Sequence, residues 1–221
     1  MDFTRRNAMT ALACLMTLLG VDAASGRDTT PKTILVLGDS LSAEYGLPRG
    51  SGWVALLTQK LQAEKIDAKV INASISGETT PGGLTRLPAL LSRHQPTHVV
   101  IELGANDALR GLPLAATRAN LTAMVRASKQ AGAQVVLVGM QVPPNYGSRY
   151  TADFLAIFDE VARKESTALV PFFLKGVADR PDARDWFQPD ATHPLAKAHP
   201  ILLGHVWQAL LPLLLGRQRR G

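Results

Sequence analysis

Cysteine is almost absent from this chain of 221 residues. The single one, Cys14, lies in an apolar segment near the N-terminus. The remainder of the chain therefore offers no disulfide, no cysteine nucleophile and no thiolate metal site. Aromatic residues make up only 5%, and no basic stretch is interleaved with aromatics as base stacking requires. We expect no nucleic-acid partner, although the net charge is +6, because half of that excess lies in Arg217, Arg219 and Arg220 at the end of the chain.

The sequence also lacks an apolar run long enough to cross a bilayer comfortably, which takes about 20 residues. Its N-terminal apolar segment, Ala8 to Val21, follows Arg5 and Arg6 and precedes small residues suited to cleavage after Ala23. This arrangement predicts a signal peptide over residues 1–23 and an exported protein, periplasmic or secreted, with no stable membrane span after cleavage. The alternatives of a Sec or a twin-arginine signal, and of an uncleaved anchor, stay open.

The rest of the chain has the composition of one globular domain, which we predict over residues 24–221. Hydrophobic residues make up 46%, enough for a full core, and charged residues only 19%, which argues against disorder. Short apolar runs alternate with longer amphipathic segments. Alternation of this kind predicts an α/β fold, with a parallel sheet covered by helices on both faces. The predicted strands are 34–37, 68–71, 99–103, 135–140 and 168–173, and the predicted helices are 53–65, 83–93, 114–131, 151–166 and 195–215.

Polar clusters follow the predicted strands directly. Residues 38–40 follow the first, 72–77 the second, 104–107 the third and 143–147 the fourth. Parallel strands end at one edge of their sheet, and ligands of such folds bind there. These segments are therefore expected to converge on one site.

Ser40 is the candidate nucleophile of that site. It follows a buried strand in a turn that Gly38 makes possible. A serine hydroxyl needs a base to take its proton, and an ordinary helix N-cap explains this segment equally well.

His193 is the best-placed base among five histidines. It stands three residues after Asp190, so one tight turn allows the carboxylate to orient the imidazole. An N-cap aspartate beside an exposed histidine is the alternative. We expect His94 and His98 in a surface loop, because Gln95 and Pro96 separate them.

Gly77 and Asn106 are candidate donors for an oxyanion, since backbone amides of glycine-containing loops and asparagine side chains serve this purpose. Taken singly, each is more often a turn residue.

Together these segments resemble the SGNH hydrolase family, also called GDSL-type esterases. The resemblance rests on the blocks at residues 38–42, 72–77, 106–107, 109–111 and 143–147, and covers roughly Lys32 to Leu214. It implies a three-layer α/β/α sandwich with a five-stranded parallel sheet, flavodoxin-like in type. Within the family, the chain is similar to the bacterial periplasmic branch of thioesterases, arylesterases and lysophospholipases. The Gly-x-Ser-x-Gly elbow of α/β-hydrolases is absent.

The resemblance also implies roles for the residues. Ser40 attacks the acyl carbonyl, His193 moves the proton, and Asp190 orients His193. The amides of Ser40 and Gly77 and the side chain of Asn106 form the oxyanion hole. The substrate is a small acyl ester or thioester, no metal or other cofactor is required, and the protein is expected to be a monomer.

Three further residues bear on the substrate rather than on the mechanism. Leu109 lies in a segment similar to one that contacts acyl chains in this branch. Glu44 and Ala105 stand where similar proteins often have glycine. We expect Glu44 to face solvent, and Ala105 requires an allowed backbone geometry beside Asn106.

Two other functions are compatible with parts of this pattern. A carbohydrate O-deacetylase would use the same three residues, but its sugar site should offer exposed aromatics along the cleft. A non-catalytic binding protein would have no need of Ser40, His193 and Asp190 together.

Overall fold

The three-dimensional structure is a computed structural model that describes residues 31–216. The predicted signal peptide, Cys14 and the three terminal arginines lie outside the described residues.

One sheet of five parallel strands forms the centre of the molecule, in the order β2-β1-β3-β4-β5. The chain moves from β1 outward to β2 and then returns to the other side of β1 with β3, so the order reverses at β1. This is the topological switch point at which parallel sheets bind ligands. The strands are β1 (Lys32–Gly38), β2 (Ala68–Asn72), β3 (His98–Glu102), β4 (Gln134–Val138) and β5 (Ala168–Val170).

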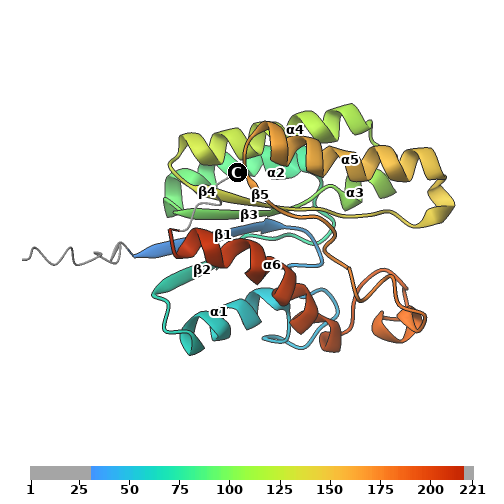
Figure 1. The fold of residues 1–221 in the computed structure, drawn as a ribbon, viewed down its shortest axis with the longest axis horizontal. Helices are drawn as coiled ribbons and strands as arrows, with labels where there is room; N and C mark the ends of the chain where they lie inside the picture. Colours follow the sequence, from blue (N-terminus) through green and yellow to red (C-terminus); the bar gives the residue numbers. More distant parts are fainter. Residues whose placement is uncertain (1–30, 217–221) are drawn as a thin grey trace, which may run out of the picture.

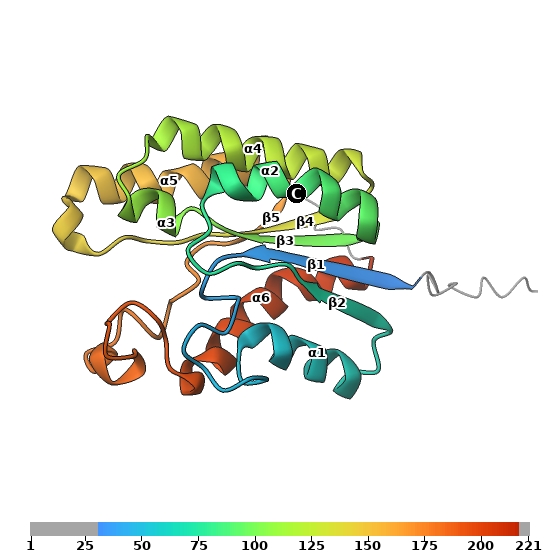
Figure 2. The same cartoon turned by 180° about the vertical axis from the view of Figure 1, so that it is seen from behind.

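Helices cover both faces of this sheet, as Figures 1 and 2 show. One face carries α2 (Thr80–His94), α3 (Ala105–Leu109), α4 (Leu114–Gln130) and α5 (Ser148–Lys164). The opposite face carries α1 (Trp53–Ala63) and α6 (His199–Leu214). Three short 3-10 helices complete the elements of residues 31–216: η1 (Pro144–Tyr146), η2 (Ala183–Trp186) and η3 (Ala196–Ala198). The predicted three-layer fold with five parallel strands is confirmed.

The central strands are buried on both faces because their sequences are almost continuously apolar. All five residues of β3 are buried, and so are the last five of β1. Trp53 of α1 and Phe158 of α5 fill the two layers between sheet and helices, and neither has more than 1% of its surface exposed. The site therefore rests on a rigid support.

Three details differ from the sequence-based prediction. His94 and His98 were expected in a surface loop, but His94 ends α2, and His98 begins β3 and is only 3% exposed. The last helix begins at His199 rather than at residue 195, with Pro200 in its first turn, where the missing N–H costs nothing. The helix α3 was not predicted. Within residues 31–216, no helix combines the length and apolarity that a bilayer crossing requires.

Candidate active site

The predicted site residues lie at the edge where the parallel strands end, which we call the carboxyl edge. Ser40 lies two residues beyond β1, and Gly77 lies in the loop between β2 and α2. Asn106 lies in α3, directly after β3. Asp190 and His193 lie in the long segment between β5 and α6, within the turn that precedes η3. The edge that the sequence predicted is the one at which the structure places them.

Ser40, His193 and Asp190 form one continuous line of hydrogen bonds. The Ser40 Oγ lies 2.8 Å from Nε2 of His193, and Nδ1 of His193 lies 2.8 Å from Oδ2 of Asp190. In the tautomer that suits this line, Nδ1–H donates to Asp190 and Nε2 accepts from the serine hydroxyl. The arrangement is that of a nucleophile, a base and an orienting carboxylate.

The other oxygen of Asp190 fixes the turn itself. Its Oδ1 accepts hydrogen bonds from the backbone N–H of His193 at 3.0 Å and of Thr192 at 2.9 Å. These bonds lower the pKa of Asp190 to about 2, and the bond from the His193 amide has the largest effect. Asp190 is consequently ionised at any pH at which a histidine base functions.

Tyr45 packs against the imidazole of His193, and Gln188 binds the backbone of both residues. The rings of Tyr45 and His193 are 4.4 Å apart between centroids. Gln188 donates two hydrogen bonds: its backbone N–H donates to the His193 carbonyl at 2.7 Å, and its Nε2 donates to the Tyr45 carbonyl at 2.9 Å. The loop after β1 and the loop carrying His193 are thus tied together.

Asn106 extends toward the nucleophile from the first turn of α3. One N–H of its Nδ2 donates to Oδ2 of Asp39 at 2.9 Å, which leaves the second N–H for another acceptor. Gly104, with a φ of 120°, provides the left-handed turn into α3. Ala105 follows in helical geometry, so the departure from glycine at that position creates no strain.

A buried aspartate fastens α3 in place. Oδ2 of Asp107 accepts the N–H of Thr80 at 2.8 Å, at the start of α2, and Oδ1 accepts the hydroxyls of Thr80 and Thr117. Asn106 is therefore carried on an element bound to both α2 and α4.

Gly77 lies in a loop that is bound to the segment after α3. Its φ of 78° is in the left-handed region that favours glycine, and its carbonyl accepts a bond of 2.8 Å from Arg110. Within the described residues, the amides of Ser40 and Gly77 donate no hydrogen bond to the protein. Both remain available to a bound oxyanion.

Glu44 was predicted to face solvent, but its carboxylate binds backbone amides of its own loop instead. Its carboxylate accepts the N–H of Gly52 at 2.8 Å and that of Gly50 at 3.0 Å. These bonds close the loop that enters α1 and stabilise the left-handed φ of 58° at Glu44. Glutamate is thus accommodated where similar sequences have glycine, because its side chain binds its own loop.

Sequence reasoning missed two buried groups beneath the nucleophile, the side chains of Asp39 and Glu102. Each is 1% exposed. Burial raises the pKa of Asp39 to about 6 and raises that of Glu102 well above its usual range. Asp39 belonged to the predicted turn, but Glu102 ends an apolar run, and nothing local marks it as part of a site.

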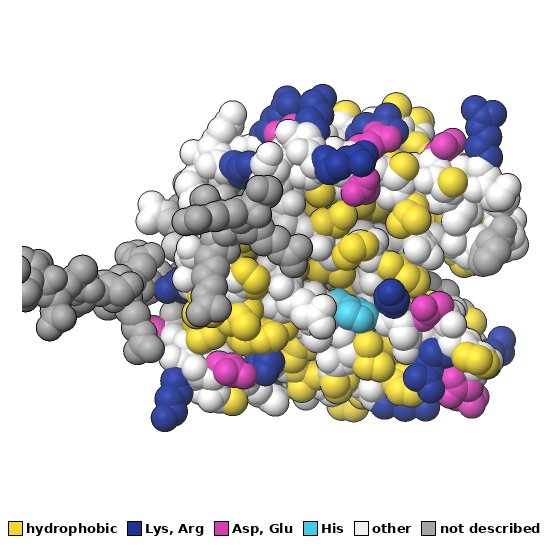
Figure 3. All heavy atoms as spheres, viewed as in Figure 1, with side chains coloured by type: hydrophobic (Ala, Val, Ile, Leu, Met, Phe, Trp, Pro, Cys, Tyr) yellow, Lys and Arg dark blue, Asp and Glu magenta, His cyan; other side chains and the backbone are white. Residues whose placement is uncertain are grey.

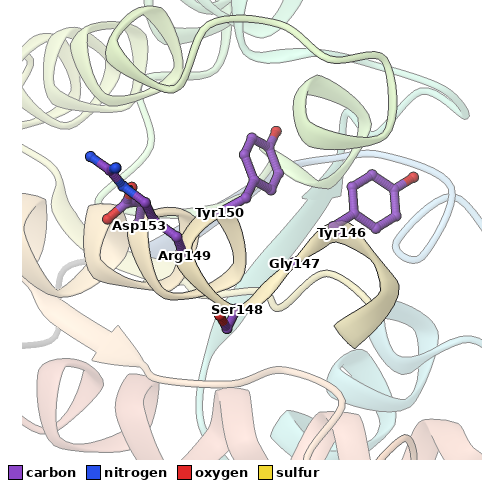
Figure 4. A pocket seen from close by; sticks show the side chains of 6 residues that line it. All are labelled: Tyr146, Gly147, Ser148, Arg149, Tyr150 and Asp153. Carbon is purple, nitrogen blue, oxygen red and sulfur yellow. The ribbon is translucent and has the colours of Figure 1, made fainter.

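Two hollows lie outside the hydrogen-bonded line. One of about 510 Å³ is lined at the start of α5 by Tyr146, Gly147, Ser148, Arg149, Tyr150 and Asp153. In Figure 4, its two tyrosines lie on one side and Arg149 and Asp153 on the other. The Tyr150 hydroxyl donates a long bond of 3.4 Å to the Ala108 carbonyl of α3, so this hollow adjoins the element that carries Asn106.

The second hollow, of about 650 Å³, lies between β5 and α6 and includes Leu169, Phe172 and His205. Figure 3 shows hydrophobic side chains gathered on this face, between the two layers of helices. None of the predicted site residues lines it. Within residues 31–216, no group of three or more His, Cys, Asp or Glu side chains is placed to hold a metal ion.

The site combines a hydrogen-bonded serine, histidine and aspartate with free amide donors, at the switch point of a parallel sheet. This combination is typical of the class of serine-dependent acyl hydrolases. Residues 36–201 match the model of the GDSL-like Lipase/Acylhydrolase family. The chain belongs to this family, and its class of activity is the hydrolysis of esters and thioesters.

Similar proteins match most of this chain. Esterase TesA of Pseudomonas aeruginosa is 47% identical over 94% of this chain and 99% of its own. Thioesterase 1/protease 1/lysophospholipase L1 of Escherichia coli is 41% identical over 85% of this chain and 88% of its own. The solved structure of the psychrotrophic esterase EstA from Pseudoalteromonas sp., inhibited by monoethylphosphonate, is 45% identical, covers 83% of this chain and 98% of its own, and has a TM-score of 0.77.

Proposed function

We propose that this chain hydrolyses carboxylic esters and thioesters of single acyl chains, with Ser40 as its nucleophile. The observation that carries the proposal is the line of two 2.8 Å contacts from Asp190 through His193 to Ser40. Relatives named esterase and thioesterase 1/protease 1/lysophospholipase L1 support the same substrate class.

In the proposed reaction, His193 Nε2 takes the hydroxyl proton as Ser40 Oγ attacks the acyl carbon. The carbonyl oxygen becomes an oxyanion that accepts bonds from the Ser40 and Gly77 amides and from the free N–H of Asn106. His193 then gives its proton to the leaving alcohol or thiol, and an acyl-serine remains. Water, deprotonated by His193, attacks that ester, releases the fatty acid and restores Ser40.

Apolar side chains around the carboxyl edge support an acyl chain as the substrate. Four of the five exposed large hydrophobic residues found in residues 31–216 lie in segments that follow β1, β2, β3 and β4. They are Tyr45, Ile75, Leu109 and Tyr146. Leu109 is 44% exposed and lies three residues from Asn106, so we assign it the contact with the chain. Such solvent-exposed apolar groups gain free energy when a chain covers them.

The test is Ser40→Ala with p-nitrophenyl esters ranging from acetate to palmitate, together with a long-chain acyl-CoA, a lysophospholipid and an acetylated sugar. We expect the variant to lose hydrolysis of every substrate and to lose covalent labelling by a fluorophosphonate. Unchanged hydrolysis by Ser40→Ala would overturn the nucleophile. A wild-type preference for the acetylated sugar over all acyl chains would favour an O-deacetylase instead.

We further propose that residues 1–23 direct export and are removed, which leaves one domain over 24–221 that acts as a monomer in the periplasm or outside the cell. The support is the basic, apolar and small-residue pattern of the N-terminus and the single sheet that includes all five strands. Mass spectrometry of the exported protein checks the cleavage site, and sedimentation checks the monomer.

A further inference from the structure

Glu102 lies directly beneath the nucleophile turn although the proposed reaction makes no use of it. It is the last residue of β3 and pairs in register with Gly38 at the end of β1. Its Oε2 accepts the Ser42 hydroxyl at 2.7 Å and lies 3.3 Å from the Asp39 amide. A Cβ on Gly38 would come within 2.9 Å of the same oxygen, so glycine at this position is what admits the carboxyl group.

A chain of hydrogen bonds with one possible direction leads from Trp53 through Ser42 to Glu102. The Trp53 indole is only a donor, and its Nε1–H donates to Ser42 Oγ at 3.1 Å. The Ser42 hydroxyl must then donate onward to Glu102. The Glu102 carboxyl group also lies against Asp39, whose backbone N–H is 3.3 Å from Oε2 and whose own carboxylate accepts from Asn106 at 2.9 Å.

Two carboxyl groups hydrogen-bond to each other only if one of them carries a proton. No ion pair joins Asp39 or Glu102 to a lysine or arginine in the part of the chain that the structure describes. Two unpaired negative charges at 1% exposure would be too costly to bury together. The pair therefore holds one proton.

The surroundings place that proton on Glu102. Asp39 accepts the N–H of Leu41 at 3.0 Å and that of Asn106 at 2.9 Å, and both bonds favour its ionised form. The charge of His193 during catalysis favours that form as well. For Glu102, complete burial and then the neighbouring charge of Asp39 raise the pKa, so its neutral form persists.

We propose that Glu102 is a positioning residue of this site: as a neutral carboxylic acid it donates its proton to Asp39 and so fixes the carboxylate that orients Asn106 toward the oxyanion. This inference rests on the function proposed above, specifically on Asn106 as an oxyanion donor. It assigns a role to a side chain that contacts neither the substrate nor the three residues in line.

The first experiment compares Glu102→Gln with Glu102→Leu. Glutamine keeps a donor for Asp39 and an acceptor for Ser42, so we expect its kcat within about threefold of wild type. Leucine keeps the volume but has no donor, so we expect kcat to fall about 10- to 100-fold with KM nearly unchanged, because the oxyanion donor is misplaced. A glutamine variant as impaired as the leucine variant would show that the charged carboxylate is required, and would overturn the proposal.

A double-mutant cycle distinguishes positioning from general damage. In the Asn106→Ala background the donor is already gone, so Glu102→Leu should lower kcat by less than about threefold further. Equal losses in both backgrounds would mean that Glu102 acts through the fold alone.

Infrared spectroscopy detects the proton on Glu102 directly, without an activity assay. Wild-type protein at neutral pH should show the C=O band of a protonated carboxyl group, and Glu102→Gln should lack it. Absence of the band in wild type would overturn the proposal even if Glu102→Leu fails to fold. The infrared band does not depend on turnover, so its absence would refute the role of Glu102 and not the proposed function. The proposed function is refuted separately, by undiminished hydrolysis in Ser40→Ala.

Discussion

Replacement of Asn106 by alanine tests the oxyanion site most directly. The Asn106 amide has two N–H groups, of which one is bound to Asp39 at 2.9 Å and one is free. Loss of one such donor lowers kcat by about 10²–10³, or ~2.7–4 kcal/mol of transition-state stabilisation. KM should change little, because the bond strengthens only as charge develops on the carbonyl oxygen.

The same substitution also removes one donor from buried Asp39. A buried acceptor that loses a partner costs about 1–3 kcal/mol of folding free energy, so the melting temperature should fall even though the fold persists. Steady-state hydrolysis of p-nitrophenyl butyrate gives kcat and KM, and circular dichroism gives the stability.

Asn120→Ala is the matched control for this experiment. Asn120 is also partly buried, and its Nδ2 donates to the Thr80 hydroxyl at 3.1 Å, but it lies in α4 and makes no hydrogen bond to Ser40, His193, Asp190 or Asp39. We expect its kcat to stay within about threefold of wild type. If Asn106→Ala changed kcat as little as this control does, Asn106 would have no part in stabilising the oxyanion.

Two further predictions concern the substrate chain and acid stability. Leu109→Ala should lower kcat/KM for a long-chain ester about three- to tenfold and leave the acetate ester unchanged, because less apolar surface meets the chain; equal losses on both esters would remove Leu109 from this contact. The pKa of Asp190 is lowered to about 2 from the ordinary 3.8, so its stabilising effect is complete above the ordinary value and is lost as pH falls toward 2. The melting temperature of wild type should exceed that of Asp190→Asn near neutral pH and converge with it in acid, and a gap independent of pH would contradict this account.

The layered fold was predictable because the hydrophobic pattern, the segment lengths and the turn residues of the sequence all indicate it. Continuous apolar runs marked the strands to within a few residues, and turn residues after each run marked the carboxyl edge. Ser40, Gly77, Asn106, Asp190 and His193 were identified from these segments, and the structure brings them to one place. Their chemical roles remain predictions for the experiments above.

The features that could not be predicted from the sequence depend mostly on contacts between distant segments. His98 was misplaced because Pro96 suggested a longer loop, whereas β3 begins two residues later. The helix α3 has only five residues, too few for a periodic pattern. Glu102 meets the nucleophile turn only through the pairing of β1 with β3, and no pattern within either strand reveals that register.

The line from Ser40 to His193 joins positions 153 residues apart in the chain. Contacts of such long sequence separation form late, since the intervening chain must be closed first. During refolding, recovery of esterase activity therefore reports the docking of the segment after β5 onto a sheet already assembled. A chain whose sheet has formed but whose last segment is still loose would pass a test for secondary structure and fail one for turnover. Circular dichroism and esterase activity, followed together during refolding, would thus time the formation of the sheet and the docking of the last segment separately.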